Sequence, residues 1–179
     1  MKGRVMQQVS IDSGNIAVSD QGTGPPLLLV HGFPLDHSMW RFQRERFAAD
    51  HRVIAPDLRG FGQSAAVTGT VTMAEHADDL LALLDALEVR EPVHFCAMSM
   101  GGYVAFEFLR RHPQRVRSLI LCDTKATADA PEGAANREKM AQEALREGAV
   151  VAEKAMLPKL LAADAPQRQP EVVDQVRRM

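Results

Sequence analysis

The stretch that decides the fold is Val93-His94-Phe95-Cys96-Ala97-Met98-Ser99-Met100-Gly101-Gly102. Its first four residues form a short apolar run, which is typical of a strand buried on both faces of a sheet. A helical stretch follows over 103–111. Between strand and helix stands Ser99, with the small residues Ala97 and Gly101 two positions away on either side. A very tight strand-to-helix turn needs small residues there, and it would hold Ser99 out over the end of the sheet.

Two interpretations of Ser99 compete. A serine between a strand and a helix can be an ordinary N-cap, whose hydroxyl accepts a hydrogen bond from the first helical turn. It can also be a nucleophile elbow, which shows the pattern small-x-Ser-x-Gly in this context. Ala97 stands where that pattern usually has glycine, and alanine is small enough for the position. We interpret Ser99 as a nucleophile.

The rest of the first two thirds of the chain alternates between expected strands and helices. Further short apolar runs lie at 27–30, 52–55 and 118–122. A helix is expected around 77–87, and Thr72 with Glu75 three residues later forms a capping box at its start. Buried strands that alternate with helices predict an α/β fold with a mostly parallel sheet.

Both ends of the chain differ from this alternation. Two short runs, 5–11 and 15–19, predict an antiparallel hairpin with a turn over 12–15. After Pro131 the composition shifts to Ala, Glu, Lys, Arg and Met, with no strand-like run. Helices are expected there at 134–147, at 150–161 with an interruption at Pro158, and from 172 to 179.

Composition narrows the class of protein. The 179 residues are 46% hydrophobic, with a formal net charge of −2 and a pI of about 6.3. This balance shows no basic surface for nucleic acid or anionic membrane, and no apolar run approaches the ~20 residues of a membrane span. The start shows no apolar signal-peptide core, so we expect a cytoplasmic protein. Two scattered cysteines, Cys96 and Cys122, are expected to be buried free thiols.

A second motif, His31-Gly32-Phe33-Pro34, directly follows the expected strand 27–30. Acyl transfer needs hydrogen-bond donors aimed at the oxyanion that forms on the attacked carbonyl. Beside a nucleophile elbow, the backbone N–H groups of Phe33 and Met100 would fill this role. His31 would shape the loop, and we place His31, Gly32 and Met98 beside the substrate, although packing explains Met98 equally well. The alternative is that the motif is only a turn.

A third motif is Asp57-Leu58-Arg59-Gly60-Phe61-Gly62-Gln63-Ser64, which follows the expected strand 52–55. Its glycines shape a loop and its charges tie that loop down, so we assign it a structural role. No cluster of His, Cys or carboxylate residues has metal-site spacing, and no glycine-rich loop has the phosphate-binding pattern. We therefore expect neither a metal nor a cofactor.

These three motifs together resemble the α/β-hydrolase superfamily, especially small bacterial esterases and the 3-oxoadipate enol-lactonase-like branch. The resemblance covers about residues 9–125, with the motifs in the family's order and spacing. It implies an α/β-hydrolase fold in which 1–125 form the N-terminal part of the core, with six strands. Residues 126–179 would form a helical cap or lid, and the last two strands of the family's sheet would be absent.

The resemblance also implies a catalytic triad in the chain order Ser, then Asp or Glu, then His. The six histidines are His31, His37, His51, His76, His94 and His112. None follows the expected strand 118–122, so the triad's base and its usual acid would lie beyond residue 179. Asp123 is an alternative acid, because some family members place their acid after the sixth strand; otherwise it is a loop residue.

The function implied is a serine hydrolase of carboxylic esters or lactones that forms an acyl-enzyme at Ser99, in a chain that is catalytically incomplete. Two alternatives stay open: a non-catalytic binding protein on the same fold, and a cofactor-free perhydrolase or haloperoxidase. A nucleophilic serine argues against haloalkane dehalogenases and epoxide hydrolases, which use aspartate. The expected partners are a small ester or lactone and, through a bare apolar edge at 119–121, a second copy or a complementing chain.

Overall fold

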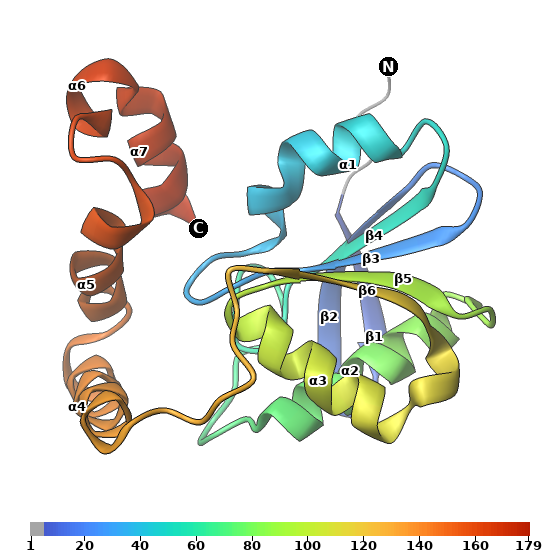
Figure 1. The fold of residues 1–179 in the computed structure, drawn as a ribbon, viewed down its shortest axis with the longest axis horizontal. Helices are drawn as coiled ribbons and strands as arrows, with labels where there is room; N and C mark the ends of the chain where they lie inside the picture. The colour runs from blue at the N-terminus through green and yellow to red at the C-terminus, as the bar shows by residue number, and fades with distance from the viewer. Residues whose placement is uncertain (1–5) are drawn as a thin grey trace. The chain divides into compact units, whose positions relative to one another are not determined.

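A computed structural model describes residues 6–179 and contains one six-stranded sheet, shown in Figure 1. The strands are β1 (Gln7–Ile11), β2 (Gly14–Gln21), β3 (Pro26–Val30), β4 (Arg52–Pro56), β5 (Val93–Met98) and β6 (Val116–Cys122). Their order across the sheet is β1-β2-β4-β3-β5-β6. β4, β3, β5 and β6 run parallel, whereas β1 and β2 are antiparallel to their neighbours. The α/β-hydrolase fold with six strands of a mostly parallel sheet is confirmed.

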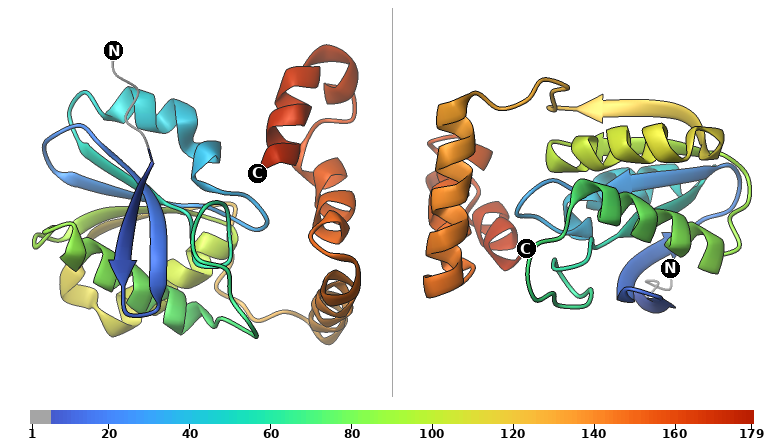
Figure 2. Two further views of the ribbon diagram at one scale, coloured as in Figure 1. Left: turned by 180° about the vertical axis from the view of Figure 1, so that it is seen from behind. Right: turned by 90° about the horizontal axis from the view of Figure 1, so that it is seen from below.

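The N-terminal hairpin is also confirmed, and its two strands stand in front in the left view of Figure 2. Gly14 begins the second strand with φ 126°, a value that glycine adopts without strain. The expected start of the first strand at Val5 lies outside the described residues.

Helices cover both faces of the sheet. Figure 1 shows α2 (Met73–Ala86) and α3 (Met100–Arg111) on one face, and η1 (His37–Trp40) and α1 (Arg41–Phe47) on the other. Side chains of β3 alternate between the two layers, as a strand requires. Leu28 and Val30 pack in the cluster with α2 and α3, whereas Leu27 and Leu29 pack in the cluster with Trp40. This double coverage explains why β3, β4 and β5 read as continuous apolar runs. The expectation of a buried strand at 118–122 is wrong, because β6 lies at the end of the strand order and none of its residues is buried.

Several helix boundaries differ from those expected. The capping box is present, because Thr72 accepts from Glu75 N while the Glu75 carboxylate accepts from Thr72 N. The helix after the elbow begins at Met100 rather than at residue 103, since the tight turn passes directly into the first helical turn. The helices η1 and α1 were not predicted from the sequence, because they lack a strong apolar stripe; α1 has no buried residue.

Residues Thr127–Met179 form a second compact unit, separate from the unit that ends at Ala126. It contains α4 (Pro131–Glu147), α5 (Val150–Leu160), α6 (Ala165–Arg168) and α7 (Pro170–Arg178). The expected interruption at Pro158 is wrong: α5 continues past this proline to Leu160, although Pro158 has no N–H for an intrahelical hydrogen bond. The short helix α6 was not predicted. Among the described residues, none of the helices is both long and apolar enough to cross a membrane.

Candidate active site

Ser99 lies between the last residue of β5 and the first residue of α3, in a backbone conformation that few serines adopt. Its φ is 50° and its ψ is −112°, and its hydroxyl makes no capping hydrogen bond to α3. An ordinary N-cap has an extended backbone and bonds the first helical turn. Thr72 at the start of α2 does both, with φ −79° and ψ 160°. Ser99 is therefore not an N-cap of the usual kind.

Hydrogen bonds hold this strained backbone at both of its polar groups. Ser99 N donates to Cys122 O at 2.9 Å, which ties the turn to the end of β6. Ser99 O accepts from Gly102 N at 2.9 Å and from Thr124 Oγ1 at 2.8 Å. Strained residues persist where surrounding contacts over-determine them, and such positions concentrate at functional sites.

Close packing explains why small residues surround Ser99. A Cβ on Gly101 would lie 2.6 Å from Val30 O and 2.7 Å from His31 O, so only glycine lets α3 approach β3 this closely. Ala97 is fully buried, in agreement with the need for a small side chain there. Gly102 also has no room for a side chain, because its Cβ would lie 2.4 Å from the side-chain oxygen Thr124 Oγ1. The sequence pattern did not single out this second glycine.

The loop after β3 lies directly against the elbow. A Cβ on Gly32 would lie 3.2 Å from both Ser99 Cβ and Met98 O. Neither Phe33 N–H nor Met100 N–H has a hydrogen-bond acceptor among residues 6–179. Two amides without an acceptor in the described chain thus adjoin the contact between Gly32 and Ser99.

His31 shapes this loop from inside the protein. Its ring is fully buried; Nε2 accepts from Leu58 N at 2.9 Å, and Nδ1 lies 3.1 Å from Gly32 O. These two contacts assign the proton to Nδ1, and burial lowers the pKa of the ring, which favours the neutral form. The ring holds the loop and presents no surface to a substrate. Phe61, which the sequence reading did not single out, contacts both His31 and Phe33 edge-on.

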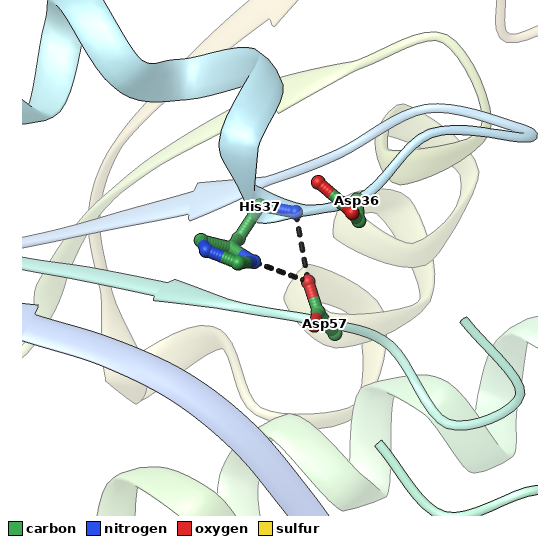
Figure 3. Close-up of side chains that lie close together, drawn as sticks. All are labelled: Asp36, His37 and Asp57. Carbon is green, nitrogen blue, oxygen red and sulfur yellow. Dashed lines mark hydrogen bonds and ion pairs between the residues drawn. The ribbon is translucent and has the colours of Figure 1, made fainter. Parts of the chain in front are cut away.

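Asp57, the first residue of the loop after β4, bonds both the backbone and the ring of His37, as Figure 3 shows. One carboxylate oxygen accepts from His37 N at 2.8 Å and from His37 Nδ1 at 2.7 Å, and the other accepts from Gln63 N at 2.8 Å. Burial alone would raise the pKa of Asp57, but these hydrogen bonds outweigh it and hold the pKa below its usual value. The structural role expected for this loop agrees with these contacts.

Asp36, His37 and Asp57 also bring three possible metal-ligand atoms within 4.8 Å of one another, a grouping that sequence spacing did not reveal. The oxygen and nitrogen atoms that could bind a metal already form hydrogen bonds within the protein. Asp36 Oδ1 accepts from Ser38 N at 2.7 Å and thereby caps η1, while Asp57 is bonded as above. A separation of 2.7 Å between His37 Nδ1 and Asp57 Oδ1 is that of a direct hydrogen bond. The arrangement therefore favours a hydrogen-bonded loop anchor over a metal centre.

The histidines are engaged elsewhere. Four rings pair with other residues: His37 with Asp57, His51 with Asp50, His94 with Ser118 and His112 with Asp78. His76 is buried, and its Nδ1 has no partner in the described chain. Within residues 6–179, no histidine ring is hydrogen-bonded to Ser99. Asp123 is exposed, has φ 42°, and lies between two residues that bond the Ser99 backbone.

Sulfur side chains surround the end of β5. Met98 and Cys122 pack on the cluster that contains Trp40 and Cys96, whereas Met100 packs on the opposite cluster. Both cysteines are free thiols, as expected, but only Cys96 is buried and Cys122 is half-buried. Burial and the neighbouring Cys122 raise the pKa of Cys96 to about 12, so Cys96 stays protonated.

Fold and elbow together define the class of protein. Residues 25–178 match the family described as alpha/beta hydrolase fold, and the chain belongs to that family. A thermophilic esterase from Thermogutta terrifontis, with malate bound, is 42% identical with a TM-score of 0.90 over 98% of this chain and 66% of that chain. The enol-lactonase from Burkholderia xenovorans LB400 is 29% identical with a TM-score of 0.87, over 96% of this chain and 66% of that chain.

A curated haloalkane dehalogenase from Sphingobium indicum is also similar, at 33% identity over 132 residues. That match covers 69% of this chain and 45% of the dehalogenase. The chain thus spans two thirds or less of the length of each of these proteins.

Proposed function

We propose that this chain carries the nucleophile and the oxyanion site of a serine hydrolase that acts on carboxylic esters or lactones. The observation that carries the proposal is the backbone of Ser99, with φ 50°, ψ −112° and a hydroxyl that does not cap α3. A serine that served only the helix would relax into a capping geometry. The similar esterase and enol-lactonase support the substrate class, and the serine separates this site from aspartate-dependent dehalogenation.

The proposed chemistry uses two backbone donors. Ser99 Oγ attacks the carbonyl carbon, and the negative charge that develops on the carbonyl oxygen is stabilised by the N–H groups of Phe33 and Met100. The first turn of α3 adds the positive end of a helix dipole at this position. A base takes the proton of the Ser99 hydroxyl and passes it to the alkoxide oxygen as the C–O bond breaks; an ester then releases its alcohol, whereas the alcohol of an opened lactone stays attached to the acyl group. Water then hydrolyses the acyl-enzyme and regenerates the Ser99 hydroxyl. His31 and Gly32 shape the donor loop, and Met98 lies beside it.

Serine needs a base to take its proton, and that base needs an orienting acid. Asp123 is our candidate acid within the chain, because the neighbouring residues Cys122 and Thr124 both bond the Ser99 backbone. The base would come from a further segment or a second chain at the exposed edge of β6. We also propose that residues 126–179, which contain the helical second unit, correspond to the cap or lid that the family resemblance implies.

A second candidate function is a non-catalytic binding protein on the same fold. The engagement of four histidine rings with other residues favours it. The strained Ser99 argues against it, since a binding protein gains nothing from a strained serine. The perhydrolase alternative uses the same residues as the hydrolase.

Labelling with a fluorophosphonate probe separates these candidates. The hydrolase proposal predicts that the probe modifies Ser99, and that Ser99→Ala abolishes the modification. Ser118→Ala is the matched control, because the Ser118 hydroxyl already bonds the His94 ring, at 2.7 Å, without any elbow geometry. Labelling that survives Ser99→Ala, or no labelling in a protein that also carries the base, would refute the proposal. Hydrolysis of a p-nitrophenyl ester against an aliphatic lactone then distinguishes the two substrate types.

A further inference from the structure

We propose that Thr124 is a positioning residue for the peptide that carries an oxyanion donor; this role rests on the function proposed above. Thr124 Oγ1 donates a 2.8 Å hydrogen bond to Ser99 O. That oxygen and the Met100 N–H belong to one planar trans peptide, in which the C=O and N–H bonds point in opposite directions. A side chain that holds the carbonyl therefore also fixes the direction of the Met100 N–H.

The second bond to the same carbonyl strengthens this constraint. Gly102 N donates to Ser99 O at 2.9 Å from within the first turn of α3. The helix thus supplies one donor and the segment after β6 supplies the other. Two donors from separate elements restrict rotation of the Ser99–Met100 peptide more than either donor alone. The Met100 N–H is left pointing away from both donors and has no acceptor in the described chain.

The segment after β6 contacts Ser99 on both sides. Cys122 O accepts from Ser99 N at 2.9 Å, and Thr124 donates to Ser99 O. Asp123, between them, has φ 42°, which turns the chain so that both neighbours can reach the same residue. A residue with positive φ is held only by such surrounding contacts. The structure therefore assigns to this segment the task of keeping the elbow in its strained form.

Gly102 makes the position of Thr124 possible. A Cβ at residue 102 would lie 2.4 Å from Thr124 Oγ1 and 2.7 Å from Thr124 Cβ and Cγ2. Any side chain there would push Thr124 away from Ser99. The absence of a side chain at this position thus serves the hydrogen bond, and a Gly102→Ala variant should reproduce the loss of the Thr124 hydroxyl.

The hydrogen bond also affects the strength of the donor. Hydrogen bonds in a chain polarise one another, by roughly 10–30% per bond. Because the Ser99 carbonyl accepts a hydrogen bond from Thr124, the amide at the other end of the same peptide becomes a better donor. An oxyanion donor acts through this property, together with its preset direction.

Amide hydrogen exchange of Ser99 and Gly102 tests the positioning directly, because both amides take part in the bonds described. The variants are Thr124→Val, which removes the hydroxyl at nearly constant shape, and Thr124→Ser, which restores it. Thr72→Val is the matched control, since it removes a bonded threonine hydroxyl from the same unit. Exchange of the fully buried Phe95, in the interior strand β5, reports global stability.

The expected result is that Thr124→Val speeds exchange of Ser99 and Gly102 by about 3–10-fold relative to Phe95, the change that loss of one neutral hydrogen bond produces. Thr124→Ser should stay close to the parent, and Thr72→Val should leave this ratio unchanged. If Thr124→Val does not fold, Gly102→Ala must show the same local change. An unchanged ratio in the folded variant overturns the proposal.

Fluorophosphonate labelling adds a readout that a purely structural role would not move. In a parent protein that labels at Ser99, Thr124→Val should lower the second-order labelling rate by about 3–10-fold, and Thr124→Ser should restore it. Thr72→Val should label at the parent rate. Equal rates in all variants would refute the link to the oxyanion donor. A protein that is supplied with the missing base and still never labels contradicts the proposed function; the hydrogen-exchange ratio tests the positioning role independently of that outcome.

Discussion

Replacing Asp57 with alanine should destabilise the protein strongly, although Asp57 touches no residue of the elbow in the contacts described above. Its side chain is fully buried and accepts hydrogen bonds from His37 N, His37 Nδ1 and Gln63 N. Each hydrogen bond to a charged acceptor contributes about 1.5–3 kcal/mol, so three would contribute about 4.5–9 kcal/mol. Removing the carboxylate also removes its desolvation cost of several kcal/mol. The net expectation is a loss of about 3–5 kcal/mol.

Urea denaturation followed by the fluorescence of Trp40 measures this loss. Trp40 is the single tryptophan, is buried, and ends η1, the helix in which His37 lies. With an m-value of about 1–3 kcal/mol per molar urea, the midpoint should fall by about 1 M or more. The loop that carries Phe33 precedes η1, so labelling of Ser99 should slow as well.

Asp50→Ala is the matched control for Asp57→Ala. Asp50 also bonds a histidine ring, that of His51, at 2.9 Å, but its side chain is 60% exposed whereas that of Asp57 is 0% exposed. Exposed ion pairs contribute little to stability, so the midpoint of Asp50→Ala should match that of the parent. Equal midpoints for the two variants would refute the reasoning that burial makes the Asp57 anchor strong.

Three further predictions concern single residues: His31, Gly101 and Ile120. Burial lowers the pKa of His31 in the folded protein, so the unfolded chain binds more protons than the folded chain as pH falls below about 6.5. The urea midpoint should therefore drop between pH 7 and pH 5. His31→Gln should make the midpoint depend less on pH. Gly101→Ala forces a Cβ against Val30 O and should cost about 1–3 kcal/mol in urea denaturation, whereas Gly133→Ala, with its nearest atom at 3.6 Å, should not destabilise. Ile120 is exposed on β6, the last strand of the described sheet, and therefore predicts self-association in analytical ultracentrifugation. Ile120→Lys should abolish the self-association, whereas Leu145→Lys, at another exposed apolar residue, should not. A parent protein that stays monomeric at all concentrations contradicts this prediction.

Local signals in the sequence were sufficient to predict the central strands, the start of α2 and the turn at Ser99. Apolar runs of about four residues marked β3, β4 and β5, because a strand covered on both faces has no polar side. The similar run in β6 marked a strand whose residues are exposed or half-buried. The capping box marked the start of α2, because a cap depends on residues only three positions apart. Ala97, Ser99 and Gly101 predicted the elbow for the same reason: the steric demand of a tight turn acts over a few neighbouring residues.

Only the tertiary structure decided what holds the elbow and its loop in place. Thr124 lies 25 positions from Ser99, and Leu58 lies 27 positions from His31. The order β4-β3-β5-β6 brings these segments to one edge of the sheet, and that order differs from the order of the strands along the chain. No periodicity or local propensity encodes such a pairing. Ser99 could therefore be recognised from its neighbours in sequence, whereas the hydrogen bonds that keep it strained depend on residues that only the folded sheet brings together.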